Sequence, residues 1–227
     1  MADIYPFARP LYVMAKAAGP QCNLRCRYCY YTEKQNLFAG GSCGMSREML
    51  EQFVQRYIEV QQMPDIQFTW HGGEPLLRPL SFYRDAVRFQ RYYGRGKRID
   101  NCLQTNGLLL TPEWCRFLAQ EQWLVGLSID GTQAMHDAYR LDAAGRGTWE
   151  RVMRAIEMLN EYGVEWNAMA TVNQANVHEP LAFYRFFRDS AAVSCSSPLW
   201  WSVRPVMLTA VIWPRCWMRT VRWPPTV

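Results

Sequence analysis

The sequence is poor in the features that mark membrane, secreted and nucleic-acid-binding proteins. No apolar run approaches the ~20 residues that a helix needs to cross a bilayer. The first ten residues lack the basic start and long apolar stretch of a secretion signal. We therefore expect a cytoplasmic protein with no membrane partner. In that reducing compartment the eight cysteines would serve a metal or catalysis rather than disulfides.

Acidic residues and lysine are missing from residues 190–227, which hold four arginines, five prolines and five of the ten tryptophans. The remaining 189 residues carry 21 basic and 20 acidic side chains, so the net charge of +5 is not spread over a phosphate-binding surface. Nucleic acid is not an expected partner. We interpret 1–189 as one domain and 190–227 as an aberrant tail without a defined fold, read from a shifted frame of GC-rich DNA.

Three cysteines fall within eight residues, in the order Cys22, Cys26 and Cys29. Thiolates of this kind hold iron–sulfur clusters, usually four to a cluster, so three would leave one iron open to an outside molecule. A structural zinc site is the rival interpretation, but structural zinc is normally bound by four ligands, usually with a second C-x2-C or histidine pair. The sequence contains no such second pair. The spacing therefore favours an iron–sulfur cluster, with a non-catalytic zinc-binding module as the alternative.

Residues 1–189 repeat an apolar, β-rich run followed by an amphipathic stretch. Strands are predicted at 11–17, 66–70, 99–104, 124–129 and 164–172, and helices at 46–62, 80–93, 112–120, 148–162 and 178–188. Such alternation predicts an α/β fold with parallel strands, joined by right-handed crossovers. Polar or glycine-containing turns follow each strand, and in barrels those turns form the site.

The motifs resemble the radical S-adenosylmethionine (SAM) superfamily, and within it the anaerobic sulfatase-maturating enzymes, over roughly residues 8–189. The resemblance is carried by the cysteine segment 20–31, by 68–75 (FTWHGGEP), by 103–107 (LQTNG), by 126–131 (GLSIDG) and by 164–168 (VEWNA). It implies a partial (β/α) barrel that is incomplete at its C-terminal end. Cys22, Cys26 and Cys29 are then expected to hold a [4Fe–4S] cluster whose open iron binds SAM.

The resemblance also implies a set of SAM contacts. The backbone of Gly73, with Glu74 nearby, is expected to accept from the SAM ammonium, and Arg140 to pair with its carboxylate. Ser128 and Tyr28 complete the set, with Tyr28 reaching the adenine. His136 lies near a predicted helix end and carries no expected role.

The family's chemistry is implied in the same way. Reductive cleavage of SAM yields a 5'-deoxyadenosyl radical, which in the sulfatase-maturating enzymes oxidises a Cys or Ser of a sulfatase polypeptide to Cα-formylglycine. The electron comes from a donor such as a flavodoxin or ferredoxin. Another radical SAM peptide-modifying maturase is the alternative within the superfamily.

The chain also departs from the family. Sulfatase-maturating enzymes continue into a cysteine-rich region with two auxiliary clusters and a catalytic aspartate base. Here Cys195 and Cys216 have no C-x2-C partner, so the auxiliary-cluster region is not recognised. The resemblance places the base in that same missing region, and no catalytic residue is therefore identified in this sequence. An inactive fragment that keeps cluster and SAM binding is a further interpretation.

Overall fold

The computed structural model describes residues 11–34, 43–189 and 209–210. Within them the sheet has the strand order β1-β2-β3-β4-β5-β6, and its first five strands run parallel. These are β1 (Met14–Ala15), β2 (Asp65–Trp70), β3 (Arg98–Thr105), β4 (Leu124–Ser128) and β5 (Trp166–Thr171). The predicted α/β fold is confirmed.

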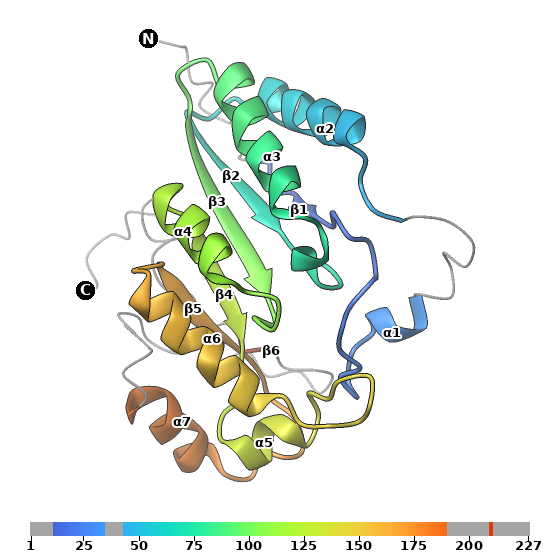
Figure 1. Ribbon diagram of the computed structural model, residues 1–227, viewed down its shortest axis with the longest axis vertical. Coiled ribbons are helices and arrows are strands. Elements are labelled where there is room, and N and C mark those ends of the chain that lie inside the picture. Colours follow the sequence, from blue (N-terminus) through green and yellow to red (C-terminus); the bar gives the residue numbers. More distant parts are fainter. Residues whose placement is uncertain (1–10, 35–42, 190–208, 211–227) are drawn as a thin grey trace, which may run out of the picture.

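Helices connect the parallel strands, and a last helix follows β5. They are α1 (Tyr31–Lys34), α2 (Arg47–Val60), α3 (Leu80–Tyr93), α4 (Pro112–Gln120), α5 (Gln133–Asp137), α6 (Trp149–Glu161) and α7 (Pro180–Asp189). The arrowheads of β2, β3 and β4 point toward the end of the molecule that carries α1 and α5 (Figure 1). The turns expected to form the site therefore gather at that end.

Local sequence explains where the long helices begin and end. α4 begins behind Thr111, whose hydroxyl accepts from the Trp114 backbone N–H, and Pro112 occupies the first helical position as predicted. α6 ends at Glu161, and Gly163 takes φ +65°, the left-handed conformation that glycine commonly adopts just after a helix.

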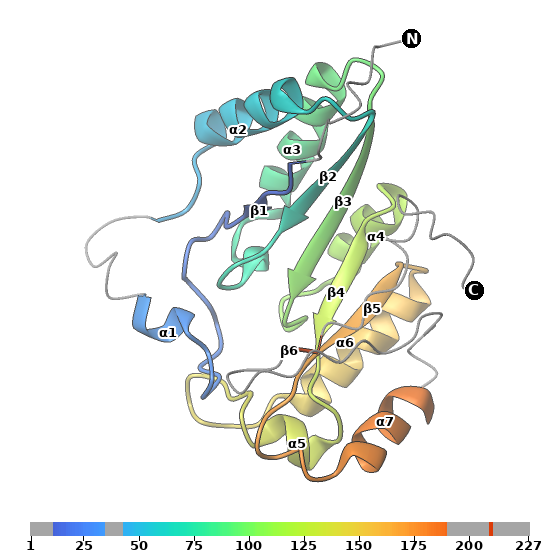
Figure 2. The ribbon, with the colours of Figure 1, turned by 180° about the vertical axis from the view of Figure 1, so that it is seen from behind.

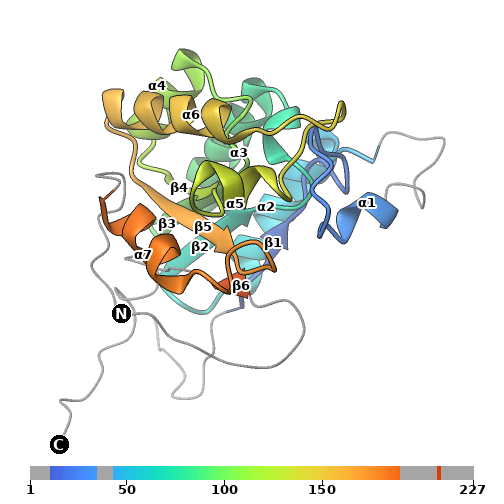
Figure 3. The same ribbon diagram turned by 90° about the horizontal axis from the view of Figure 1, so that it is seen from below.

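Residues facing the helices form one apolar core. In β2, Ile66, Phe68 and Trp70 are buried and alternate with less buried residues, which is the period-2 pattern of a strand. Helices α3, α4 and α6 cover this side of the sheet (Figure 3). Trp70 stacks on Trp123 with ring centroids 6.2 Å apart, and Tyr83 packs edge-on against both rings.

The view from behind shows the opposite face of the sheet, with β2 to β5 in front of α3, α4 and α6 (Figure 2). A hollow of about 310 Å³ lies on this face, lined by residues that include Thr69, Gln104, Gly126 and Met169. An open, curved parallel sheet with helices outside it is the arrangement of a partial (β/α) barrel. No described helix is both long and apolar enough to span a bilayer.

Several short elements were not predicted. α1, α5 and the 3-10 turn Pro75–Leu77 span five residues or fewer, so no hydrophobic period can reveal them. β1 covers two residues rather than the seven predicted. Thr209–Ala210 form β6, which pairs antiparallel with β5. The rest of the predicted aberrant tail, including Cys195 and Cys216, lies outside the described residues.

Candidate functional site

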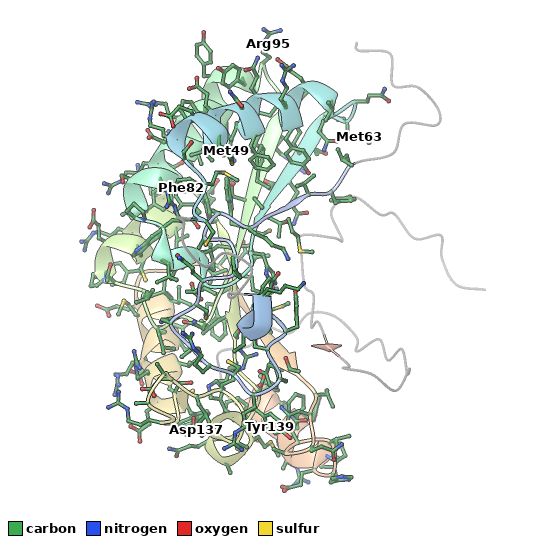
Figure 4. The ribbon with its side chains drawn as sticks, turned by 90° about the vertical axis from the view of Figure 1, so that its right-hand side faces the viewer. Met49, Met63, Phe82, Arg95, Asp137 and Tyr139 are labelled. Carbon is green, nitrogen blue, oxygen red and sulfur yellow. The ribbon has the colours of Figure 1, made fainter. Side chains whose placement is uncertain are left out.

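The cysteine loop follows β1 and lies against the segment that follows α5. The backbone N–H of Arg25 donates to the Leu141 oxygen at 2.8 Å, and that of Arg27 donates to the Tyr139 oxygen at 2.9 Å. Asp137 and Tyr139 lie at one end of the molecule and Arg95 at the other (Figure 4). The loop is therefore anchored by backbone hydrogen bonds beside residue 140, at the end of the sheet where the strands terminate.

Cys22, Cys26 and Cys29 are free, partly buried thiols. Burial, helped by the nearby charges of Glu74, Cys26 and Cys29, raises the pKa of Cys22 to about 11. Burial also raises the pKa of Cys26, which the Arg140 cation opposes. A metal centre here must displace thiol protons, as metals bound by cysteine do.

The three thiols fit a cluster better than a single ion. No group of three His, Cys, Asp or Glu side chains in the described part of the chain is arranged to hold one metal ion. A cubane makes a different demand, because each cysteine binds a separate iron. The sulfur of Cys22 also accepts from the Leu24 backbone N–H at 3.4 Å, a type of bond that tunes such clusters.

The turn after β2 explains why glycine occupies position 73. Gly73 has φ +53°, and a Cβ added there would lie 2.1 Å from the Gln21 carbonyl oxygen. The next residue, Glu74, donates its backbone N–H to that same oxygen at 2.7 Å. The turn is thus packed directly against the backbone that leads into Cys22, and a side chain at position 73 would separate the two.

Glu74 is a buried carboxylate that joins the turns after β2 and β3. It accepts from the Thr105 hydroxyl at 2.6 Å and from the backbone N–H groups of Asn106 and Leu76 at 2.9 and 3.0 Å. Burial raises its pKa to about 7, although these three donors oppose the shift. The two turns fix this side chain, predicted to lie near the SAM ammonium, close enough to the cysteine loop for its charge to act on Cys22.

Asn106 is a site residue that the sequence reasoning did not single out. Its side-chain amide donates to the Asn23 side-chain oxygen at 2.8 Å and lies 3.8 Å from the Cys22 sulfur. It thereby ties the turn after β3 to the cysteine loop. The only sequence signal was its place in the Thr-Asn-Gly turn that follows the third strand.

Asp130, two residues after the end of β4, is the second residue that was missed. Its side chain is fully buried and accepts from the Tyr28 hydroxyl at 2.5 Å, the Thr171 backbone N–H at 2.8 Å and Arg140 Nη2 at 3.0 Å. Arg140 Nε lies 2.9 Å from Asp130 Oδ2 but is not aligned for a hydrogen bond, so this buried N–H lacks a partner among the described residues. One carboxylate therefore joins the cysteine loop to the ends of β4 and β5.

Tyr28 and Arg140, both predicted from the family resemblance, are brought together by this carboxylate. The Arg140 guanidinium carbon lies 5.5 Å from the centre of the Tyr28 ring, and that ring stacks on Tyr139 at 5.7 Å. Burial raises the pKa of the Tyr28 hydroxyl, and the Asp130 charge raises it further. Ser128 is buried two residues before Asp130, at the last position of β4.

Comparison with known proteins gives a consistent set of relatives. Residues 18–187 match the radical SAM superfamily. The chain is 55% identical over 185 residues to a serine-type anaerobic sulfatase-maturating enzyme of Bacteroides thetaiotaomicron, covering 81% of this chain and 45% of the relative. It is 34% identical to a cysteine-type anaerobic sulfatase-maturating enzyme of Clostridium perfringens, covering 84% of this chain and 53% of that enzyme.

The solved structures agree with the sequence relatives. A structure described as native anSMEcpe with bound AdoMet and Cp18Cys peptide superposes with a TM-score of 0.73 at 34% identity, covering 80% of this chain and 48% of that one. The form with bound AdoMet alone gives a TM-score of 0.71. The chain spans about half the length of the curated relatives that it matches.

Proposed function

Because the chain belongs to the radical SAM superfamily, we propose that it forms the SAM-cleaving half of a sulfatase-maturating enzyme. Cys22, Cys26 and Cys29 would hold a [4Fe–4S] cluster with SAM beside it. When bound, this pair supplies reductive cleavage of SAM to methionine and a 5'-deoxyadenosyl radical. The observation that carries the proposal is three partly buried thiols on one loop, next to a buried arginine with an unpaired N–H.

The chain's own residues would bind and orient SAM. Arg140 offers its unpaired Nε–H to the carboxylate, while Asp130 holds the guanidinium in place. The Gly73 turn presents backbone beside Cys22, and Glu74 places a negative charge nearby for the ammonium. Tyr28 offers its ring for the adenine, and Ser128 lies at the adjoining strand end.

For the reaction, we propose oxidation of a serine or cysteine side chain in a sulfatase polypeptide to Cα-formylglycine. The relative at 55% identity is named serine-type, which favours a serine substrate. No catalytic base for this step is identified among the described residues. The matched relatives extend over about twice the aligned length. The electron would come from a donor such as a flavodoxin or ferredoxin.

The proposal can be tested in two stages. First, the anaerobically reconstituted chain, with SAM and dithionite, should release methionine and 5'-deoxyadenosine, measured by chromatography. A colourless protein with one tightly held zinc and no SAM products would contradict cluster binding. Second, the chain extended to the length of its relatives should convert a Ser-x-Pro-x-Arg peptide to its aldehyde, seen as a mass loss of about two units. SAM cleavage without that loss would favour another peptide-modifying activity.

A further inference from the structure

His136 is a fully buried histidine on α5 to which the proposed function gives no task. Both of its ring nitrogens have partners. Nδ1 accepts from the Asp130 backbone N–H at 3.2 Å, and Nε2 lies 3.0 Å from the Thr148 hydroxyl oxygen. Since Nδ1 accepts, the single proton of the neutral ring lies on Nε2 and is donated to Thr148.

Thr148 continues this series of bonds to Arg140. Its hydroxyl accepts from His136 and donates to the Arg140 backbone oxygen at 2.9 Å. Its backbone N–H donates to Asp137 Oδ1 at 2.7 Å, which keeps the threonine fixed at the start of α6. The bonds therefore run in one direction, from the Asp130 N–H through imidazole and hydroxyl to the Arg140 carbonyl.

The two ends of this series belong to the two residues of the buried ion pair. Asp130 and Arg140 are joined through their side chains, and His136 with Thr148 joins them again through their backbones. We propose that His136 is a positioning residue, which holds the backbones of Asp130 and Arg140 so that the guanidinium is placed for the SAM carboxylate. The inference rests on the proposed function, because it takes SAM as the ligand.

The electrostatic surroundings keep the imidazole neutral, as this bond pattern requires. Burial, helped by the Arg140 cation, lowers the pKa of His136 to about 4. The carboxylates of Asp130 and Asp137 act in the opposite direction but do not outweigh burial. A protonated ring would lose the Nδ1 acceptor and release the Asp130 N–H.

The inference is tested by SAM affinity rather than turnover. The dissociation constant for SAM is measured by calorimetry on the cluster-loaded chain, on three variants at position 136 and on one control variant. His136→Phe removes both bonds and should weaken SAM binding about tenfold. His136→Asn places an amide oxygen near the Nδ1 position and should stay within about threefold of wild type, whereas His136→Gln keeps only the Thr148 side and should resemble His136→Phe. The exposed His178 supplies the control His178→Phe, with unchanged affinity.

Urea midpoints of the same proteins separate positioning from folding. A purely structural role would lower the midpoint of His136→Phe yet leave its SAM affinity at the wild-type value, and that result overturns the inference. If His136→Phe does not fold, Thr148→Val breaks the same series and Thr148→Ser restores it. Weak binding by the valine variant with recovery in serine supports the inference, and equal binding by both overturns it. A wild-type chain that carries the cluster but binds no SAM overturns the proposed function, and this inference with it.

Discussion

Replacing Asp130 by Asn tests whether the buried ion pair stabilises the site end of the sheet. Asp130 is fully buried and Arg140 nearly so, and their side chains meet through Nη2 at 3.0 Å and Nε at 2.9 Å. Asparagine keeps the shape and can still accept from the Thr171 N–H. It removes the charge that offsets the guanidinium, so the loss comes from an unpaired buried cation.

The size of the loss follows from the burial of both partners. Removing one partner of a buried ion pair costs about 3–5 kcal/mol. The Tyr28 ring, 5.5 Å from the guanidinium carbon, offsets part of this through a cation–π contact of about 1 kcal/mol. We expect Asp130→Asn to lower the free energy of unfolding by about 3 kcal/mol.

Urea unfolding of the cluster-free chain, followed by circular dichroism, measures this loss. Asp85 provides a control, because its carboxylate pairs with arginine as well, in this case with Arg47 and Arg88 on the surface. Asp85→Asn should cost about 1 kcal/mol or less. The double variant Asp130→Asn/Arg140→Gln should lose clearly less than the sum of the two single variants. Equal losses for the two aspartates, or strict additivity of the pair, would refute the reasoning.

Three further predictions follow from single contacts. The folded pKa of His136, about 4, lies below its unfolded value of 6.5, so its contribution to stability is complete above pH 6.5 and is lost as the pH falls toward 4. The lost free energy of unfolding should be about 3 kcal/mol, measured by urea titration at each pH. His136→Phe should remove this part of the pH dependence. Gly73→Ala should lower the iron bound per chain, since its Cβ would lie 2.1 Å from the Gln21 oxygen. The control Gly96→Ala, at φ +82° with open space around it, should bind the normal amount of iron. Equal iron contents in the two variants would contradict the packing argument. Asp137→Ala removes the acceptor of the Thr148 and Trp149 N–H groups at the start of α6. It should lower the free energy of unfolding in urea by about 1–2 kcal/mol, and Asp137→Asn should recover this loss. An unchanged urea midpoint in Asp137→Ala would exclude this capping role.

Much of the fold could be predicted because its long elements carry clear periods. β2 to β5 and the helices α2, α3, α4, α6 and α7 lie within a few residues of the predicted ranges, since strand alternation and capping residues act locally. β1 is an exception, because only Met14 and Ala15 pair with β2 although the apolar run is longer. The short helices α1 and α5 gave no period to read.

The candidate site was predictable where residue type alone carries the chemistry, as in the three clustered cysteines. Its supporting contacts were not, because they join distant residues of ordinary type. Asp130 accepts from Tyr28 across 102 positions of sequence, and in the sequence Asp-Gly after a strand looks like turn punctuation. His136 likewise looked like a helix-end histidine until burial and its two ring partners were visible.

The central claim is that Cys22, Cys26 and Cys29 together hold one four-iron cluster that SAM can reach. The most direct measurement is iron and acid-labile sulfide per chain after anaerobic reconstitution, with electron paramagnetic resonance of the reduced protein before and after SAM is added. The account predicts close to four irons, a spectrum altered by SAM, and loss of the cluster when the three cysteines are replaced by Ala. Cys115→Ala, on α4, should keep it. A triple variant that retains four irons, or a wild-type spectrum that SAM leaves unchanged, would contradict the account.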